Sequence, residues 1–387
     1  MKEWKEYNIG EICDTISDTY KGNASNVVLI NTSDVLEGKC LNHTFVPNKD
    51  LRGQFKKQFK KNDILYSEIR PANKRYAFID FEPTDYIAST KLMVIRSNDK
   101  VLPKFLYYIL QSKEMIENLQ FLAESRSGTF PQITFSELAI QTILLPEVKE
   151  QNIIVNFLEA LDSKIELNRR INDNLEQQAQ ALFDHYFDSG SMYLEDSTTE
   201  CLTDIAVYLN GLAMQKFPAT DIERSLPVLK IKELGQHKCD NSSDRCSDSI
   251  DADYIIDNGD IIFSWSGTLM VDVWCGGKCG LNQHLFKVTP LKNYPRWFVY
   301  YWTNRHLKKF KLIAKDKAVT MGHIRRSDLE NAEVAVPKNL NMLEIDARIN
   351  PLFQSIIDRR LEITKLENIR DTLLPKLMSG ELTINEI

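Results

Sequence analysis

Two short stretches have residue types that could perform chemistry, and the first could belong to a methyltransferase. Residues 350–353 read Asn-Pro-Leu-Phe, close to the (N/D)-P-P-(Y/F) tetrapeptide of enzymes that methylate adenine. No glycine-rich G-x-G cofactor loop precedes it, and it falls inside a helical apolar pattern. A Walker lysine loop is also missing from the sequence. The sequence therefore predicts neither methyl transfer nor nucleotide-driven translocation, and we expect no catalytic residue.

The second stretch could hold zinc, because cysteine and histidine are the usual zinc ligands. Cys275 and Cys279 have a C-x3-C spacing, with Gly-Gly-Lys between them. Structural zinc sites usually combine two tight pairs of ligands, and no second tight pair occurs here. We interpret the stretch as a glycine hairpin with packed thiols and predict no metal. The other residues nearby with ligand side chains are His237, Cys239, Cys246 and His284.

Local clusters of lysine and arginine point to nucleic acid, although the chain has a net charge of −6. Residues 52–75 carry 8 basic and 2 acidic side chains, and residues 296–326 carry 9 basic and 1 acidic. Clustered positive charge, rather than the total charge, is the electrostatic footprint of a DNA-binding surface. A solvated charged surface is the alternative for both clusters.

Residue types within and near these clusters suggest two roles. Lysines position a protein on DNA by contacting phosphates, whereas arginine and asparagine can form paired hydrogen bonds with guanine and adenine. The predicted DNA contacts in the first half are Lys56, Lys57, Lys60, Lys61, Ser67, Arg70, Asn73, Lys74, Arg75, Arg126, Ser127 and Thr129. Those in the second half are Ser264, Trp265, Ser266, Thr268, Lys315, Lys317, His323, Arg325 and Arg326.

Two long helical patterns would hold these surfaces in place. From residue 146 to residue 186, apolar residues return at alternating spacings of three and four, and no Gly or Pro follows Pro146. This pattern predicts a long helix with a narrow apolar seam that pairs with another helix. The predicted seam is Leu158, Leu161, Ile165, Asn168, Leu175 and Leu182 in the first helix, and Ile349, Leu352, Ile356, Ile363, Leu366 and Leu373 in the second.

Polar and proline residues in these helices allow further predictions. Asn168, within the seam, would fix the register of the pair at some cost in stability. Arg359 and Arg370 would pair with acidic residues of the facing helix. Pro351 would kink or restart the second helix, and Pro375 would disturb its last turn, because proline lacks the N–H that a helix interior needs.

The chain contains the whole arrangement twice. Adding 191 to each seam position of the first helix gives the equivalent position of the second, with Arg359 in the place of Asn168, and Pro146 corresponds to Pro337. Strand and loop signals ahead of the helices also repeat, at offsets from 191 to 199. Such self-similarity indicates a duplicated unit. We predict an α+β fold: two similar α/β domains, residues 1–146 and 191–336, alternate with two long helices, residues 147–190 and 337–387. The helices would pair as an antiparallel coiled coil with pseudo-twofold symmetry.

The composition, 43% hydrophobic and 26% charged, is typical of a globular protein. No apolar run approaches the roughly 20 residues of a membrane span, and residues 1–12 lack the apolar core of a signal peptide. Seven cysteines, an odd number, suit a reducing cytosol. We expect a cytoplasmic protein that has no membrane partner.

The order of domains and helices resembles the specificity (S) subunits of Type I restriction–modification systems. Residues 370–382, RDTLLPKLMSGEL, are similar to the closing motif of that family. Residues 129–133, TFPQI, resemble the segment that closes each recognition domain, and His323 takes the place of Gln132 in the second copy. The resemblance covers essentially the whole chain. It implies a non-catalytic reader, in which each target-recognition domain binds one half of a split double-stranded DNA site through the major groove.

The same resemblance implies the partners. The two helices would set the gap between the half-sites and dock two methyltransferase (M) subunits, which in turn recruit the restriction and translocation (R) subunits. S-adenosylmethionine would be held by the M subunits, so no cofactor is expected in this chain.

Two other functions are compatible with parts of the sequence. A stand-alone coiled-coil adaptor that binds DNA or protein would have the same helices, but basic clusters in both halves favour DNA. A fused modification enzyme would need the methyltransferase and nuclease motifs that are missing. Neighbouring genes for M and R subunits, or co-purification with an M subunit, would separate these possibilities.

Overall fold

The computed structural model describes residues 4–49, 53–125, 131–188, 190–291, 294–316 and 323–384. It divides into two compact units: unit 1 is Met1–Ser163 with Asn368–Ile387, and unit 2 is Lys164–Glu367. Each unit holds one α/β domain and parts of both long helices. Because the units cut through the helices, the four-part division by residue number stays a prediction. Arg126, Ser127, Thr129 and Lys317 lie outside the described residues.

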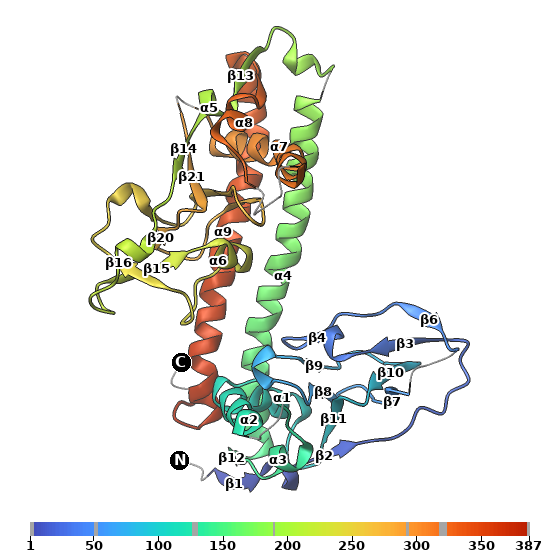
Figure 1. Ribbon diagram of the computed structural model, residues 1–387. Coiled ribbons are helices and arrows are strands. Elements are labelled where there is room, and N and C mark those ends of the chain that lie inside the picture. The colour runs from blue at the N-terminus through green and yellow to red at the C-terminus, as the bar shows by residue number, and fades with distance from the viewer. Residues whose placement is uncertain are drawn as a thin grey trace. The chain divides into compact units, whose positions relative to one another are not determined.

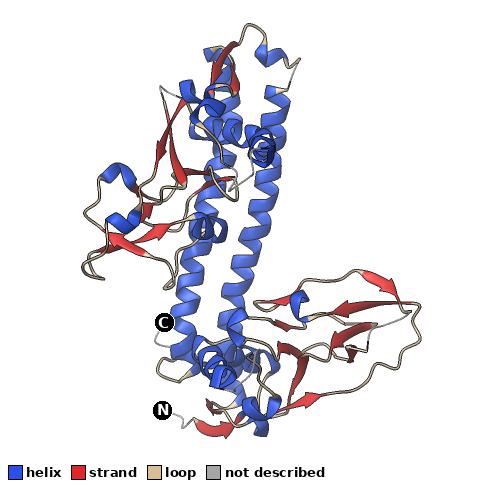
Figure 2. Ribbon diagram, viewed as in Figure 1, coloured by secondary structure: helices blue, strands red, loops and turns tan. Residues whose placement is uncertain are grey.

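The first α/β domain, in unit 1, is built on two four-stranded sheets within the described residues (Figure 2). One sheet has the order β6-β3-β10-β7 with β3 and β10 parallel, and the other is antiparallel with the order β2-β11-β8-β9. β1 pairs with β12, which brings the two ends of the domain together, and β4 pairs with β5. The elements are β1 Lys5–Asn8, η1 Ile9–Glu11, β2 Cys13–Ile16, β3 Asn26–Ile30, η2 Thr32–Asp34, β4 Val35–Leu36, β5 Lys39–Cys40, β6 Phe45–Pro47, β7 Phe55–Lys57, β8 Ile64–Ser67, η3 Pro71–Asn73, β9 Tyr76–Phe78, β10 Tyr86–Ser89, β11 Leu92–Ser97, α1 Pro103–Leu110, α2 Lys113–Ser125, α3 Phe135–Ala139 and β12 Thr142–Leu145.

The second α/β domain, in unit 2, repeats this topology (Figure 1). Its sheets have the orders β16-β15-β20-β17, with β15 and β20 parallel, and β14-β21-β18-β19, and β13 pairs with β22. The two domains thus match strand for strand in their larger sheets, which confirms the internal repeat. The elements are η4 Met192–Leu194, β13 Thr198–Cys201, α5 Leu202–Ile205, β14 Ala206–Asn210, η5 Met214–Lys216, β15 Ser225–Leu229, α6 Ile231–Gln236, β16 Arg245–Ser247, η6 Ala252–Tyr254, β17 Ile255–Ile256, β18 Ile261–Ser264, β19 Met270–Val273, β20 Cys279–Leu281, β21 Leu285–Pro290, α7 Arg296–Asp316, α8 Arg326–Glu330 and β22 Glu333–Val336.

Local side-chain caps decide where some of these elements begin. The helical pattern of residues 102–121 is divided into α1 and α2, because the Ser112 hydroxyl accepts the Met115 N–H (3.3 Å) and starts a new helix. α3 occupies residues 135–139, ahead of β12. Thr134 and Glu137 form a capping box there, with the Thr134 N–H 2.6 Å from the Glu137 carboxylate.

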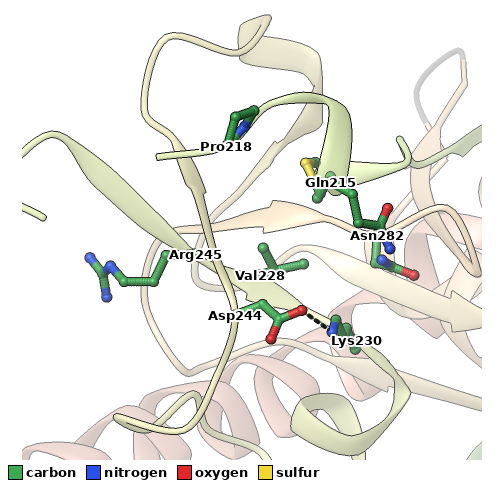
Figure 3. A pocket seen from close by; sticks show the side chains of 8 residues that line it. Gln215, Pro218, Val228, Lys230, Asp244, Arg245 and Asn282 are labelled. Atoms are coloured by element: carbon green, nitrogen blue, oxygen red, sulfur yellow. Dashed lines mark hydrogen bonds and ion pairs between the residues drawn. The ribbon is translucent and has the colours of Figure 1, made fainter. Parts of the chain in front are cut away.

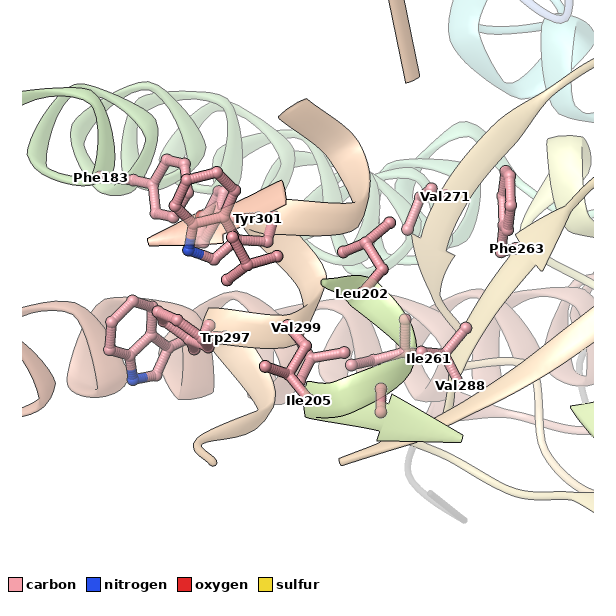
Figure 4. Close-up of a cluster of buried hydrophobic side chains, with 14 of the residues drawn as sticks. Phe183, Leu202, Ile205, Ile261, Phe263, Val271, Val288, Trp297, Val299 and Tyr301 are labelled. Atoms are coloured by element: carbon pink, nitrogen blue, oxygen red, sulfur yellow. The ribbon is translucent and has the colours of Figure 1, made fainter. Parts of the chain in front are cut away.

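The hydrophobic core of the second domain continues onto the long helices of unit 2. Figure 4 shows Phe183 of the first long helix beside Tyr301 of α7, and their ring centroids lie 5.3 Å apart. Ile349 and Phe353 of the second long helix belong to the same buried cluster. Burial of such side chains stabilises each by about 1.5–3 kcal/mol, so the domain is held to both helices by its core.

The long helices are α4 (Val148–Phe187) and α9 (Asn339–Met378), and their segments are antiparallel within each unit. In unit 1, Asp162 pairs with Arg370 at 3.0 Å. In unit 2, Arg169 pairs with Glu367 at 2.6 Å and Glu176 with Arg360 at 2.8 Å. No predicted seam residue is exposed: Leu158, Ile165, Asn168, Ile349 and Ile356 are buried, and Leu161, Leu175, Leu182, Leu352, Ile363, Leu366 and Leu373 are partly buried. The helix segments of each unit therefore pair antiparallel, and the predicted seam residues are covered.

Midway along α4 and α9, polar residues that belong to unit 2 replace the apolar seam. Asn168 is fully buried, and its side-chain carbonyl accepts a hydrogen bond of 3.2 Å from Arg359. Arg359 thus pairs with an amide rather than with an acid, which corrects the prediction for this residue, whereas Arg370 has its predicted acidic partner. Asn168 and Arg359 are 191 residues apart, so they are equivalent positions of the repeat, and the polar layer marks its centre.

α9 continues as one helix through Pro351 and Pro375, so the prediction that Pro351 restarts the helix is wrong. Each proline removes one helix hydrogen bond, a loss worth about 3 kcal/mol in a helix interior. Both prolines are exposed, and buried residues flank them, such as Phe353 and Leu377. Packing of the apolar face is therefore sufficient to continue the helix.

Candidate nucleic-acid interface

In unit 1, two segments far apart in sequence meet beyond the end of β8. Residues 68–75 connect β8 to β9, and residues 131–133 lead into α3. Ile69 forms a backbone bridge with Gln132, and backbone hydrogen bonds of 2.9 and 3.1 Å flank it. The two segments form one surface, which we call the first paired-loop site.

Unit 2 has the equivalent arrangement beyond the end of β18. Residues 265–269 connect β18 to β19, and residues 323–324 lead towards α8. Ser266 forms a backbone bridge with His323, and the Ile324 N–H donates to the Trp265 carbonyl at 3.0 Å. We call this surface the second paired-loop site. In both domains the loop after one strand, β8 or β18, thus lies against the segment that closes the domain. We call β8 and β18 the central strands.

Arg70 and Asn73 are the exposed side chains of the first paired-loop site with the chemistry to read bases. Neither side chain hydrogen-bonds to another residue within the part of the chain that the structure describes. Arg70 has a φ of 45°, in the left-handed region, which costs a non-glycine residue roughly 1–2 kcal/mol. Strain of this kind is often kept where a loop must hold a side chain for function.

Trp265 is the centre of the second paired-loop site. Its indole N–H donates to the Asn210 side chain at 2.9 Å, which fixes the orientation of the ring. The rings of His284 and His323 each lie with their centroids 6.2 Å from the Trp265 ring. An aromatic ring fixed among hydrogen-bonding groups can contact a base by both stacking and polar atoms.

Three of the predicted contacts are corrected, because Ser67, Ser264 and Ser266 are at most 6% exposed. The Ser67 hydroxyl accepts the Ile69 N–H at 3.0 Å, and the Ser264 hydroxyl donates to the Thr268 carbonyl at 2.8 Å. These serines hold the loops in shape and are not available to DNA in this conformation. Thr268 is exposed at the tip of its loop.

Two of the predicted basic contacts also have structural partners. Arg75 donates to the carbonyls of Ser33 (3.0 Å) and Val35 (3.4 Å). Lys74 pairs with Glu37 at 3.2 Å, and both side chains are exposed. Arg75 therefore anchors the loop to η2 and β4, whereas the ion pair of Lys74 is weak enough to be exchanged for a phosphate.

The lysines around β7 also divide into exposed residues and one residue with a structural partner. Lys56, Lys60 and Lys61 are exposed, and we call them the first basic turn. Lys57 is half-buried, and its ammonium donates to the Leu92 carbonyl at 2.8 Å. Burial lowers the pKa of Lys57, and the charge of Lys91 lowers it further against the opposing effect of Glu68. Lys57 is therefore part of the sheet, and the other three are free to contact phosphates.

This division gives a testable prediction for the first basic turn. Changing Lys56, Lys60 and Lys61 to Gln should weaken binding to all DNA duplexes and lower the slope of log affinity against log salt by about 2.7, since each phosphate contact contributes about 0.9. Lys57→Gln should leave the slope unchanged and reduce thermal stability instead. Fluorescence anisotropy over a salt series measures the slopes, and equal slopes for the triple variant and the wild type would show that the turn is only solvated.

The second basic cluster lies on α7 and around the closing segment. Lys315 is exposed on the last turn of α7, and His323, Arg325 and Arg326 are exposed beyond it. Arg326 pairs with Glu330 at 3.5 Å within α8. These residues border the second paired-loop site in the chain, so their predicted role in DNA contact stays open to test.

A hollow of about 210 Å³ lies on the second domain between β15, β16 and η5 (Figure 3). Lys230 and Asp244, which line it, form an ion pair, and Arg245 is held by the Ser225 hydroxyl at 2.6 Å. Asn282, on its rim, accepts the backbone N–H of His284 at 3.2 Å. The hollow therefore adjoins the second paired-loop site, but its charged groups already have partners.

The structure adds residues to the candidate interface that sequence reasoning missed. Lys91 is exposed and lies 3.4 Å from Gln132 and 3.8 Å from Glu68, at the first paired-loop site. Asn210 and His284 reach the second site from β14 and from the loop before β21. Gln132 could have been found from the sequence, because the repeat aligns it with His323.

The stretches that could suggest catalysis or metal binding have structural roles. The tetrapeptide of residues 350–353 lies within α9, and its Phe353 is buried in the core. Cys275 and Cys279 are buried in different apolar clusters, and burial raises the pKa of the Cys275 thiol to about 11. Among the described residues, no group of three or more His, Cys, Asp or Glu side chains is placed to hold a metal ion. None of the helices described is long and apolar enough to span a membrane.

Comparison of the sequence with known proteins identifies the family to which this chain belongs. The sequence model of the Type I restriction modification DNA specificity domain matches twice, at residues 1–177 and 195–370. The specificity subunit of the Type I restriction enzyme HindI from Haemophilus influenzae is 31% identical, over 99% of this chain and 100% of that protein. The MjaIX specificity subunit from Methanocaldococcus jannaschii is 27% identical, over 75% of this chain and 71% of that protein.

A solved structure has the same fold. The S subunit of a Type I restriction–modification system from M. genitalium superposes with a TM-score of 0.54 at 18% identity, over 97% of this chain and 96% of that one. The chain belongs to the family of Type I restriction–modification specificity subunits.

Proposed function

We propose that this chain is the DNA-recognition subunit of a Type I restriction–modification complex and performs no catalysis itself. The observation that carries the proposal is the duplicated paired-loop site. Each domain presents equivalent loops at the end of its central strand, and the side chains on these loops differ: Arg70 and Asn73 in the first, Trp265 and His323 in the second. Two equivalent surfaces with different chemistry suit the reading of two different half-sites of double-stranded DNA.

The helices suit the assembly of this complex. α4 and α9 each contribute residues to both units, so one pair of helices links the two recognition domains. We infer that its length sets the gap between the half-sites and that its repeated surface docks two M subunits. R subunits would join through the M subunits. The proposal places the complex in the cytoplasm, with the DNA that it reads.

S-adenosylmethionine, in this proposal, is bound by the M subunits. The sequence of this chain has no G-x-G cofactor loop, and the residues that resemble a methyltransferase tetrapeptide lie in a packed helix. An adaptor that binds protein through its domains is the competing function. The exposed lysines and Arg70 beside the paired-loop sites favour DNA over a protein partner.

The experiment that tests the proposed function compares the chain alone with the chain and its M subunit. The purified chain with S-adenosylmethionine should methylate no DNA, because it holds no cofactor. Co-expressed with the M subunit in cells free of other methylation, it should produce methylated adenines at one bipartite sequence, which methylation-sensitive sequencing identifies. Methylation by the chain alone, or methylation without a bipartite sequence in the complex, would contradict the proposal.

A further inference from the structure

The last part of α7, residues 304–316, is equivalent residue for residue to α2 of the first domain. α2 ends at Ser125 and α7 ends at Asp316, a difference of 191 residues, the offset of the repeat. Burial follows the same offset: Leu119 and its counterpart Phe310 are both buried, as are Ala123 and Ala314. The outward faces of α2 and α7 can therefore be compared position by position.

The charge of this outward face is reversed between the domains. α2 is acidic where α7 is basic, and all of the side chains concerned are exposed. The lysines of α7 form no ion pair with any residue that the structure describes. The matched positions are Glu114 and Arg305, Glu117 and Lys308, and Glu124 and Lys315.

The turn before the central strand, β8 or β18, differs in charge in the opposite sense: it is basic in the first domain and acidic in the second. Its geometry is the same in both domains: the Lys60 N–H donates to Asp63 at 2.7 Å, and the Asp257 N–H donates to Asp260 at 2.9 Å. With this alignment, the exposed Lys56 of the first domain corresponds to the exposed Asp253 of the second. The first domain is thus basic at the turn and acidic at the helix, and the second domain is acidic at the turn and basic at the helix.

The lengths of the central loops vary together with these charges. In the first domain, residues 68–75 reach α2, and the Ala72 N–H donates to the Gln120 side chain at 3.0 Å. In the second domain the loop is only residues 265–269, and Lys311 takes the position of Gln120. Lys311 is exposed where Gln120 is partly covered. The face of α7 therefore lies open beside the second paired-loop site.

We propose that the two domains hold the DNA backbone with different elements. The second domain uses the α7 lysine stripe, which we define as Lys308, Lys311 and Lys315, and the first domain uses the first basic turn. This inference rests on the proposed function and names the surface that binds phosphate in the second domain. The acidic counterparts, on α2 and on the turn of residues 253–257, face away from phosphates.

The geometry of the stripe suits phosphate contact. Residues spaced by three and four in a helix lie on one face, so the three ammonium groups follow a line along α7. The inward face of α7 is packed, with Phe310 fully buried against Phe263 at 5.9 Å between ring centroids. The helix is therefore rigid, and lysines on a rigid element can contact successive phosphates without reading sequence.

The test uses the full-length chain and a DNA duplex of mixed sequence, with binding measured over a salt series. Changing Lys308, Lys311 and Lys315 to Gln should lower the slope of log affinity against log salt by about 2.7. Lys309→Gln is the control, because this lysine is exposed on the flank of the same helix, and it should leave the slope nearly unchanged. Changing Glu117 and Glu124 to Gln, in the first domain, should leave the slope unchanged.

The outcomes separate this inference from the proposed function. A wild-type chain that binds no duplex would contradict the proposed function itself. A wild-type chain that binds with a steep slope, together with a stripe variant of equal slope, would overturn only the role of α7. Circular dichroism melting checks that each variant folds, and glutamine keeps the helix propensity of lysine. If Lys309→Gln alone lowers the slope by about 0.9, one third of the loss expected for the triple variant, the effect is one of general charge, and the stripe is not a contact surface.

Discussion

Replacing Arg360 by alanine should destabilise the chain by about 3–5 kcal/mol, because it leaves a buried carboxylate without its cationic partner. Arg360 of α9 lies 2.6 Å from Asp272 of β19 and 2.8 Å from Glu176 of α4. Asp272 is 7% exposed, and His237 lies 2.7 Å from its other oxygen. One guanidinium therefore joins the second recognition domain to both long helices of unit 2.

The internal repeat supplies a matched control for this prediction. Arg169 is the residue equivalent to Arg360, and it pairs with Glu367, the equivalent of Glu176, at 2.6 Å. That pair has no third partner like Asp272 among the described residues, and the Arg169 side chain is 46% exposed. Arg169→Ala should cost only about 0.2–1 kcal/mol. Urea unfolding of both variants measures the difference, and equal losses would show that Asp272 is not held by Arg360.

The pH dependence of the Arg360 variant follows from the state of Asp272. Burial tends to raise the pKa of this carboxyl, but His237 and Arg360 outweigh burial and hold it below its usual value of 3.8. A depressed pKa gives a contribution that is complete above pH 3.8 and is lost as the pH falls through the lower folded value. The unfolded states of wild type and Arg360→Ala are alike, so their difference in stability changes only where the folded proteins bind different numbers of protons. Without Arg360 the burial of Asp272 raises its pKa in the variant above that in the wild type, so the difference should be largest at neutral pH and shrink as the pH falls through the interval between these two pKa values.

The two long helices and the internal repeat could be predicted from the sequence, because both depend on the spacing of apolar residues along the chain. An apolar residue every three or four positions specifies which face of a helix is buried, and the constant offset of 191 specifies the partner. Leu158 and Ile349 illustrate this, since both are buried where the seam places them. Pro351 shows the limit of local rules, because the packed apolar face outweighs the missing hydrogen bond.

The candidate interface was only partly predictable, because burial and tertiary hydrogen bonds decide which polar residues are available. The sequence cannot distinguish Lys56 from Lys57, yet one is exposed and the other is bound to the Leu92 carbonyl. Ser67 and Arg70 are three residues apart, and only Arg70 reaches solvent. Lys91 approaches Gln132 across 41 residues of sequence, a contact that no local pattern encodes.

Lengthening the helices by one heptad should widen the gap in the DNA site by about three base pairs. Seven residues lengthen a helix by roughly 10 Å at 1.5 Å per residue, and duplex DNA rises about 3.4 Å per base pair. Seven residues, rather than another number, preserve the seam because they restore the same face of the helix. The half-sites themselves should stay the same, since neither paired-loop site is altered.

The antiparallel pairing decides how this experiment must be built. An insertion in α4 alone would leave seven residues without a partner in α9, so both helices need the insert at equivalent positions. Ile171 and Glu362 are 191 residues apart and lie close to the polar layer of Asn168 and Arg359. Insertion after both residues lengthens the pair at its centre and leaves the cores of both domains intact.

Methylation-sensitive sequencing of cells that carry the double-insertion variant with its M subunit gives the result directly. The expected pattern is the two original half-sites separated by a gap that is longer by about three base pairs. The variant with the insert in α4 alone is the control, and it should lose methylation because its helices no longer match. An unchanged gap with full methylation would mean that the helices do not act as the ruler. An altered half-site would mean that recognition extends beyond the two domains.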